Sequence, residues 1–92
     1  MEPSLKATIV ICSYNGRKLI GTALDSVLHQ NFPSDQYEVI VVDDGSRDGL
    51  SEYVAKRIAG LPNAHLITHE KNQGLSAARN TGWQAAQGEI VL

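Results

Sequence analysis

The chain has 92 residues, a formal net charge of −2 and one cysteine. A chain of this length forms one small domain at most, and its nearly balanced charge gives no electrostatic basis for binding nucleic acid or an anionic membrane. The lone cysteine excludes an internal disulfide and a cysteine-based zinc site, and the lack of a signal peptide or of an apolar stretch of roughly 20 residues predicts a cytoplasmic protein.

Strand and helix patterns alternate from the start of the chain. Residues 7–13 form a continuous apolar run, which is typical of a central parallel strand covered on both faces. We expect Ser13 or Asn15 to cap the next helix, which extends to about Gln30, and residues 32–35 to end it. Its apolar residues recur at helical spacing: Leu19, Ile20, Ala23, Leu24, Val27 and Leu28.

The middle of the chain predicts a second strand and a second helix. The strand covers 37–43, and Ser46 or Asp48 opens the helix that follows. Gly60 and Pro62 end this helix. Its inner face is marked by Leu50, Tyr53, Val54, Arg57 and Ile58.

The last third of the chain repeats this order. Residues 64–68 predict a short third strand, and 69–74 form a polar loop. A third helix is expected from about 75 to 86, with Gly88 as its stop. Residues 89–92 begin a fourth strand.

The resulting β-α-β-α-β-α-β order predicts an α/β fold with a mostly parallel sheet, right-handed crossovers and helices on both faces. The sequence stops inside the expected fourth strand. An interior strand that stops short would leave an exposed apolar face and an open edge. We therefore expect residues 1–92 to be a single partial domain.

Two adjacent carboxylates, Asp43 and Asp44, follow the second strand and precede a turn at Gly45. Ligands of open α/β sheets bind at the carboxyl ends of strands, and adjacent acids repel unless donors, a cation or water satisfy them. A carboxylate only accepts hydrogen bonds, so Asp44 would accept the N3 proton of uracil or the edge donors of guanine and would disfavour cytosine. Asp43 would satisfy local backbone amides, and the alternative is that one of the pair caps the following helix.

The loop after the first strand has no glycine motif for phosphate. It reads Ser13-Tyr14-Asn15, which matches neither G-x-G-x-x-G nor G-x-x-x-x-G-K and argues against a dinucleotide dehydrogenase and a P-loop enzyme. A hydroxyl, an aromatic ring and an amide suit a flat base instead. The alternative for Tyr14 is ordinary packing.

A third feature is the segment 72–82, NQGLSAARNTG, whose small residues allow a helix to lie close to the sheet. Arg79 lies in the first turns of that helix. A helix amino-terminus favours anions, and a guanidinium adds paired donors for phosphate or a base carbonyl. The alternatives are a solvated arginine and an ion pair with Asp43 or Asp44.

The remaining polar residues are weaker signals. No histidine has a partner at metal-ligand spacing; the three are His29, His65 and His69. Trp83 is expected to pack on its helix face, and Cys12 to be a buried, inert thiol.

Taken together, these segments resemble the nucleotide-binding half of the family 2 glycosyltransferases, which have the Rossmann-like GT-A fold. The resemblance runs from about Leu5 onward and covers nearly the whole chain. It is carried by IVICSYN at 9–15, VVDDGSRD at 41–48, NQGLSAARNTG at 72–82 and AQGEIVL at 86–92. Cys12 is a departure, because the family often has Pro or Thr there.

The resemblance implies inverting transfer of a sugar from a nucleoside-diphosphate donor, commonly a UDP-sugar, to a saccharide or lipid acceptor. The parent protein would then be compatible with association at the cytoplasmic face of a membrane. The nucleotide-binding residues that it implies are Ser13, Tyr14, Asn15, Asp43, Asp44, Gly74 and Arg79.

In the family, an Asp-x-Asp motif after the strand corresponding to 89–92 holds Mg²⁺ or Mn²⁺ against the diphosphate, and the general base comes later. We expect neither the metal ligands nor a catalytic residue in this sequence, and no sugar transfer by this piece alone.

Two other classes remain open from the sequence. A receiver-like signalling domain also has paired acids at strand ends, although those follow its first strand. A non-catalytic interaction module could pair or self-associate through the open edge of its fourth strand.

Overall fold

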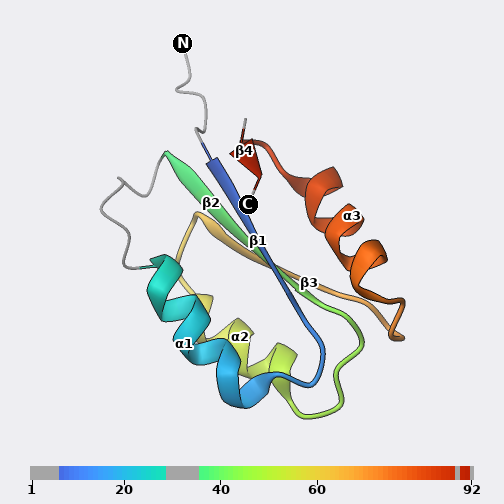
Figure 1. The fold of residues 1–92 in the computed structure, drawn as a ribbon. Coiled ribbons are helices and arrows are strands. Elements are labelled where there is room, and N and C mark those ends of the chain that lie inside the picture. Colours follow the sequence, from blue (N-terminus) through green and yellow to red (C-terminus); the bar gives the residue numbers. More distant parts are fainter. Residues whose placement is uncertain (1–6, 29–35, 89, 92) are drawn as a thin grey trace.

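The computed structural model describes residues 7–28, 36–88 and 90–91. Four strands form one sheet in the order β3-β2-β1-β4, and every neighbouring pair is parallel (Figure 1). The strands are β1 (Ala7–Ser13), β2 (Tyr37–Asp43), β3 (Ala64–Thr68) and β4 (Ile90–Val91). This confirms the parallel α/β sheet that the sequence predicted.

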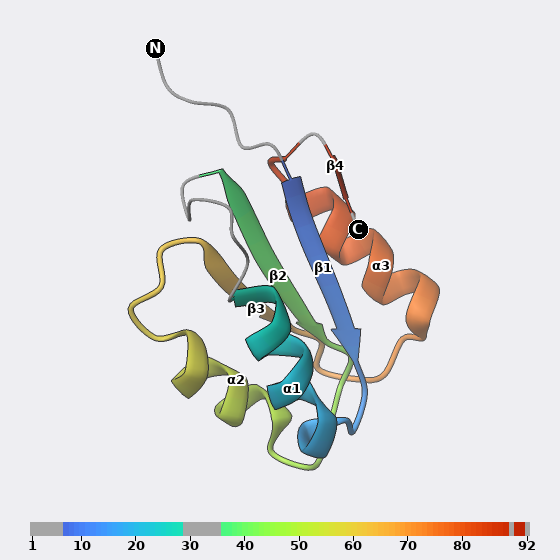
Figure 2. The same ribbon diagram turned by 60° about the vertical axis from the view of Figure 1, so that its left-hand side comes forward.

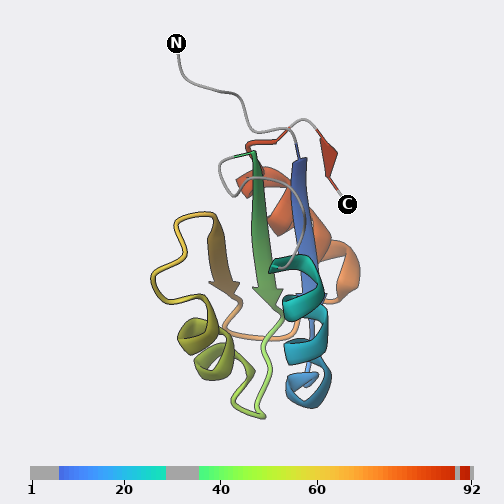
Figure 3. The ribbon, with the colours of Figure 1, turned by 90° about the vertical axis from the view of Figure 1, so that its left-hand side faces the viewer.

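Three helices cover the two faces of the sheet. They are α1 (Arg17–Leu28), α2 (Leu50–Ile58) and α3 (Leu75–Ala85). Figures 2 and 3 show α1 and α2 on one face and α3 on the other. Because a parallel pair of strands needs a crossover, each helix carries the chain back to start the next strand in the same direction.

The core is divided into two by β2, whose residues are all buried. Side chains alternate across a strand, so Val39 and Val41 pack with α1 and α2, whereas Ile40 and Val42 pack against Ala78 of α3. A strand with apolar residues on both faces therefore fits the central position of this sheet.

β1 is less covered than β2, since most of its residues are half-buried. β2 pairs with β1 along its whole length, but β4 pairs only with Ala7 and Thr8. Within the described residues, the carboxyl half of β1 thus has a strand on one side only.

A buried polar cluster joins β1, β2 and the end of α3. The Thr8 hydroxyl donates to Glu38 Oε2 at 2.8 Å, and the Gln87 amide donates to the same oxygen at 2.6 Å. The Gly88 amide donates to Thr8 Oγ1 at 2.8 Å. Glu38 is 3% exposed and Thr8 is fully buried. Their hydrogen bonds hold the Gln87 and Gly88 amides, which directly precede β4. The sequence analysis did not single out this cluster.

The predicted element bounds agree closely with those observed. α3 ends at Ala85, one residue before the predicted end. The predicted helix end near Gln30, the break at 32–35 and two positions of the fourth strand, 89 and 92, lie outside the described residues.

The predicted cap of α1 was wrong. Asp48, at the start of the second βα unit, accepts a hydrogen bond from the Arg17 amide through Oδ2 at 3.0 Å. Its Oδ1 accepts from the Leu50 amide at 3.2 Å, so Asp48 does bind the first amide of α2, although the N-cap residue is Gly49 and not Asp48 or Ser46 as predicted. Asn15 instead accepts from the Arg47 amide at 2.9 Å, because the two strand-end loops lie side by side.

Candidate functional site

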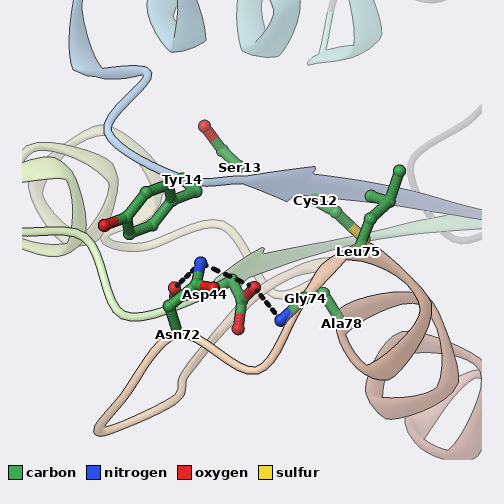
Figure 4. A pocket seen from close by; sticks show the side chains of 8 residues that line it. All are labelled: Cys12, Ser13, Tyr14, Asp44, Asn72, Gly74, Leu75 and Ala78. Atoms are coloured by element: carbon green, nitrogen blue, oxygen red, sulfur yellow. Dashed lines mark hydrogen bonds between the residues drawn. The ribbon is translucent and has the colours of Figure 1, made fainter.

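A cavity of about 280 Å³ lies where the carboxyl ends of β1 and β2 meet the amino-terminus of α3. It opens on the sheet face that carries α3 (Figure 4). Its lining residues are Cys12, Ser13, Tyr14, Asp44, Asn72, Gly74, Leu75 and Ala78. Strand ends and a helix start converge here, as expected of a ligand site in an open parallel sheet.

The end of β1 supplies one wall of this cavity. Cys12 packs with the residues under α3, and Tyr14 lies two residues further along the chain. The Tyr14 ring is 52% exposed, so one of its faces is available to a planar ligand. The Ser13 hydroxyl points away from Asp44 (Figure 4) and toward Gly16, where a Cβ would lie 2.5 Å from the Ser13 oxygen.

Cys12 contributes to the cavity although the sequence analysis expected an inert, buried thiol. It is partly buried, and burial raises the pKa of the thiol, while Arg79 acts in the opposite direction and Asp44 raises that pKa further. The thiol is therefore neutral at physiological pH. Strand alternation could have revealed its place, because Val10, Cys12 and Tyr14 fall on one face.

Asp44 is the central polar group of the site, and it is 4% exposed. Its Oδ1 accepts from the Gln73 amide at 2.8 Å and lies 2.8 Å from His69 Nδ1. Its Oδ2 accepts from the Gly74 amide at 2.9 Å and from the Asn72 side chain at 3.1 Å. The carboxylate thus shapes the turn that leads into α3.

These donors decide the charge of Asp44. Burial by itself raises the pKa of the carboxyl, but the hydrogen bonds from His69, Gln73 and Gly74, together with the charge of His69, outweigh it and leave the pKa lowered from 3.8. A carboxylate that accepts several hydrogen bonds is stabilised in its ionised form. Asp44 is therefore an anion that only accepts hydrogen bonds.

Gly45 allows the turn after β2 to lie against the turn before α3. Its φ is +78°, which favours glycine, and a Cβ at this position would lie 2.4 Å from the Asn72 amide nitrogen. Main chain therefore meets main chain here. This approach brings the Asn72 side chain within reach of Asp44.

Asp43 lies next to the cavity but does not line it. It is 1% exposed, and its Oδ1 accepts from the Ser46 amide at 2.9 Å, in agreement with the expectation that it satisfies local amides. The Ser51 hydroxyl, in α2, donates to its other oxygen. Asp43 thus holds the turn that carries Asp44.

Asn15 lies in the loop between β1 and α1 but does not line this cavity. Its amide donates to Ser46 Oγ at 2.8 Å and its φ is +54°, a conformation that asparagine tolerates better than most residues. It belongs to a second, wider hollow of about 640 Å³ at the start of α1. The residues lining that hollow are Asn15, Gly16, Arg17, Lys18, Leu19 and Asp48.

Arg79 is exposed on α3 and does not line the cavity. Its positive charge lowers the pKa of the Cys12 thiol, against the larger effect of burial. Within the part of the chain that the structure describes, no ion pair joins it to Asp43 or Asp44. The ion-pair alternative for Arg79 is therefore not supported.

The sequence analysis missed two residues that the structure brings to Asp44. His69 was set aside as a weak signal, and Asn72 was named only as part of a loop. Both act on a carboxylate that lies 25 or 28 positions earlier in the chain. The polar character of 69–74 was the one available hint.

Among residues 7–28, 36–88 and 90–91, no group of three or more histidine, cysteine, aspartate or glutamate side chains could hold a metal ion. The donor set of this part of the chain therefore does not fit the metal that the resemblance implies. No helix in the same residues is long and apolar enough to cross a membrane.

The family model described as "Glycosyl transferase family 2" matches residues 8–92. The chain therefore belongs to glycosyltransferase family 2, and the receiver-like alternative loses its basis. Among curated relatives, the glycosyltransferase AglE of Haloferax volcanii is 36% identical over 84 residues, which are 91% of this chain. A poly(ribitol-phosphate) β-N-acetylglucosaminyltransferase, TarS of Staphylococcus aureus, is 36% identical over 89 residues, or 96% of this chain.

Solved structures agree with this assignment. The mannosyltransferase PcManGT of Pyrobaculum calidifontis, in complex with GDP-Man and Mn²⁺, has a TM-score of 0.87 and 34% identity over 97% of this chain. TarS in complex with UDP-GlcNAc has a TM-score of 0.86 and 32% identity over 96% of this chain. The matched region is 26% and 25% of those two chains, and 28% of AglE and 15% of TarS in the curated relatives. The 92 residues thus correspond to the amino-terminal GT-A region of much longer proteins.

Proposed function

We propose that this chain forms the nucleotide-binding part of a glycosyltransferase that transfers a sugar from a nucleoside-diphosphate donor, with a UDP-sugar as the favoured donor, to a saccharide or lipid acceptor. The observation that carries the proposal is the cavity at the ends of β1 and β2, with an exposed aromatic ring and a buried carboxylate on its walls. Stacking and an edge-directed acceptor are what a nucleobase requires.

Asp44 and Asn72 give the proposal a specific form. The side-chain nitrogen of Asn72, Nδ2, donates to Asp44 Oδ2 and to the Asp44 main-chain oxygen, both at 3.1 Å. These are the longest hydrogen bonds of this aspartate. Asn72 is also exposed, whereas the other donors belong to the main chain or to a buried ring. The N3 proton of uracil would displace the Asn72 amide from Oδ2 while Tyr14 stacks on the base.

The nature of the donors bound by relatives supports this form. One related structure contains UDP-GlcNAc and another GDP-Man. Uracil and guanine both present an N–H on the Watson–Crick edge, which an acceptor-only carboxylate can bind, whereas cytosine presents a ring nitrogen that accepts.

The diphosphate would lie toward α3. The helix begins after Gly74, so its free amides and its dipole favour an anion, and Arg79 is a cation of the same helix. A divalent cation would neutralise the leaving diphosphate. For the whole protein we propose Mg²⁺ or Mn²⁺, in line with the Mn²⁺ of the related mannosyltransferase.

The test is to titrate UDP and CDP into the protein and into its Asp44→Asn variant by calorimetry. Loss of a hydrogen bond to a charged group costs about 1.5–3 kcal/mol, so we expect UDP affinity to fall about 10- to 100-fold. In the wild-type protein UDP should bind more tightly than CDP.

Glu52→Gln is the matched control, because it removes the same charge from an exposed position in α2. It should leave UDP affinity unchanged. Equal UDP affinity of the wild type and Asp44→Asn, or tighter binding of CDP, would show that Asp44 does not bind the base.

A further inference from the structure

His69 links the two sides of the cavity without lining it. Its Nδ1 lies 2.8 Å from Asp44 Oδ1, at the end of β2, and its Nε2 lies 2.8 Å from Thr81 Oγ1, in the middle of α3. The His69 side chain is 9% exposed and that of Asp44 5%. The His69 main-chain amide also donates to the Asp43 carbonyl at 2.9 Å, which fixes the main chain that carries the ring.

Proton counting defines what the ring does. Asp44 is a carboxylate and can only accept, so Nδ1 carries a proton. The Thr81 hydroxyl has one proton and lies 3.0 Å from the Ala77 carbonyl and 2.8 Å from Nε2, so its contact with the ring can run in either direction. The Nδ1–H and the Asp44 carboxylate form a charge-assisted hydrogen bond that is largely shielded from solvent.

We propose that His69 is a positioning residue for the nucleotide site: it orients the Asp44 carboxylate for the base N–H and ties that carboxylate to α3, whose first turn faces the diphosphate. This inference rests on the proposed function of the site. The ring does not touch the ligand and acts through Asp44.

The two oxygens of Asp44 explain why orientation matters. Oδ1 is held by His69 and by the Gln73 amide, whereas Oδ2 accepts from the Gly74 amide and from the exposed Asn72 side chain, the donor that the base would displace. Without the Nδ1–H donor, the carboxylate loses one of the two contacts on Oδ1 and the only one that comes from a side chain. The expected result is weaker binding of a base that carries an edge N–H.

Two amide substitutions separate the two contacts of the ring. Asparagine places its side-chain nitrogen near the position of Nδ1, so His69→Asn keeps the contact with Asp44 and loses that with Thr81. Glutamine reaches the position of Nε2, so His69→Gln keeps Thr81 and loses Asp44. Both remove the same ring and differ in size by one methylene.

We expect UDP affinity to fall about tenfold or more in His69→Gln and to stay within about threefold of the wild type in His69→Asn, as one charged hydrogen bond predicts. Thermal unfolding of both variants is measured alongside, because a purely structural role would lower stability in both and would not separate their affinities. An equal loss of affinity in the two variants, or none in His69→Gln, would overturn the proposal.

A measurement on the wild type does not depend on how the variants fold. In the protein with ¹⁵N-labelled histidine, Nδ1 of His69 should carry a proton, because its partner Asp44 can only accept. A ring protonated at Nε2 alone would overturn the contact on which the proposal rests. Failure of the wild type to bind UDP or GDP would reject the proposed function instead, so the two failures are distinguishable.

Discussion

At the scale of single residues, Asp44 serves the fold and the candidate site at once. It fixes the main chain of the turn at Gln73 and Gly74, and it offers its charge to the cavity. A residue with both tasks cannot be changed without altering the shape of the site. Variants of Asp44 must therefore be compared for stability as well as for binding.

The lowered pKa of Asp44 makes stability depend on acid in a defined direction. Because the folded-state pKa lies below the ordinary 3.8, the stabilising contribution is fully present above 3.8 and is lost as pH falls through the folded value. We expect the free energy of unfolding of the wild type to exceed that of Asp44→Asn at neutral pH, and the difference to shrink at pH values below 3.8. Urea unfolding over a pH series measures this, and a difference that stays constant into acid would contradict it.

Part of the site could be predicted from residue positions alone. Tyr14 and Asp44 follow apolar strands directly, so their place at one sheet edge follows from parallel topology. His69 and Asn72 could not be predicted in their roles, because their partner is fixed only by the approach of two turns. The Ser13 hydroxyl faces away from Asp44 because successive side chains of a strand point to opposite faces of the sheet, and Ser13 follows Cys12, which faces the cavity.

At the scale of elements, Asp48 joins the starts of two helices. One carboxylate oxygen accepts from the first amide of α1 and the other from the first amide of α2. Both helices point their amino-termini at the same edge of the sheet, where such amides lack partners within the helix. Local signals pointed to Asp48 near the start of α2, where the N-cap itself is Gly49, but the contact with α1 depends on a residue 31 positions away.

Replacement of Asp48 tests this shared cap. Asp48→Ala removes an acceptor from both helices, and we expect a loss of about 1–2 kcal/mol in the free energy of unfolding. Asp48→Asn keeps a side-chain oxygen and should lose clearly less. Urea denaturation compares the two, and equal stability of the alanine and asparagine variants would rule out a capping role.

At the scale of the whole molecule, the buried cluster of Thr8 and Glu38 joins elements from both ends of the chain. The Gly88 amide and the Thr8 hydroxyl are 80 positions apart in sequence. A charged residue inside a central strand is costly unless it is fully hydrogen-bonded, which explains the two donors on Glu38 Oε2. The alternation of strands and helices predicted the parallel sheet, but Glu38 looks like an ordinary strand residue until Gln87 is brought beside it.

Two substitutions of Glu38 separate volume from hydrogen bonding. Glu38→Leu leaves the Gln87 amide and the Thr8 hydroxyl without their acceptor, and we expect about 1–3 kcal/mol of destabilisation with faster hydrogen exchange at Gln87 and Gly88. Glu38→Gln keeps a carbonyl oxygen and should be milder. Unchanged exchange at these two amides in Glu38→Leu would argue against the cluster as the anchor of β4.

The contact at Gly45 also has a consequence for recombination among relatives. The turn after β2 and the turn before α3 fit each other main chain against main chain, although α2 and β3 lie between them in sequence. An exchange point within α2 would separate two halves of one fitted surface. The turns at Gly45 and at Asn72 therefore have to be inherited or grafted together if this fitted surface is to be kept.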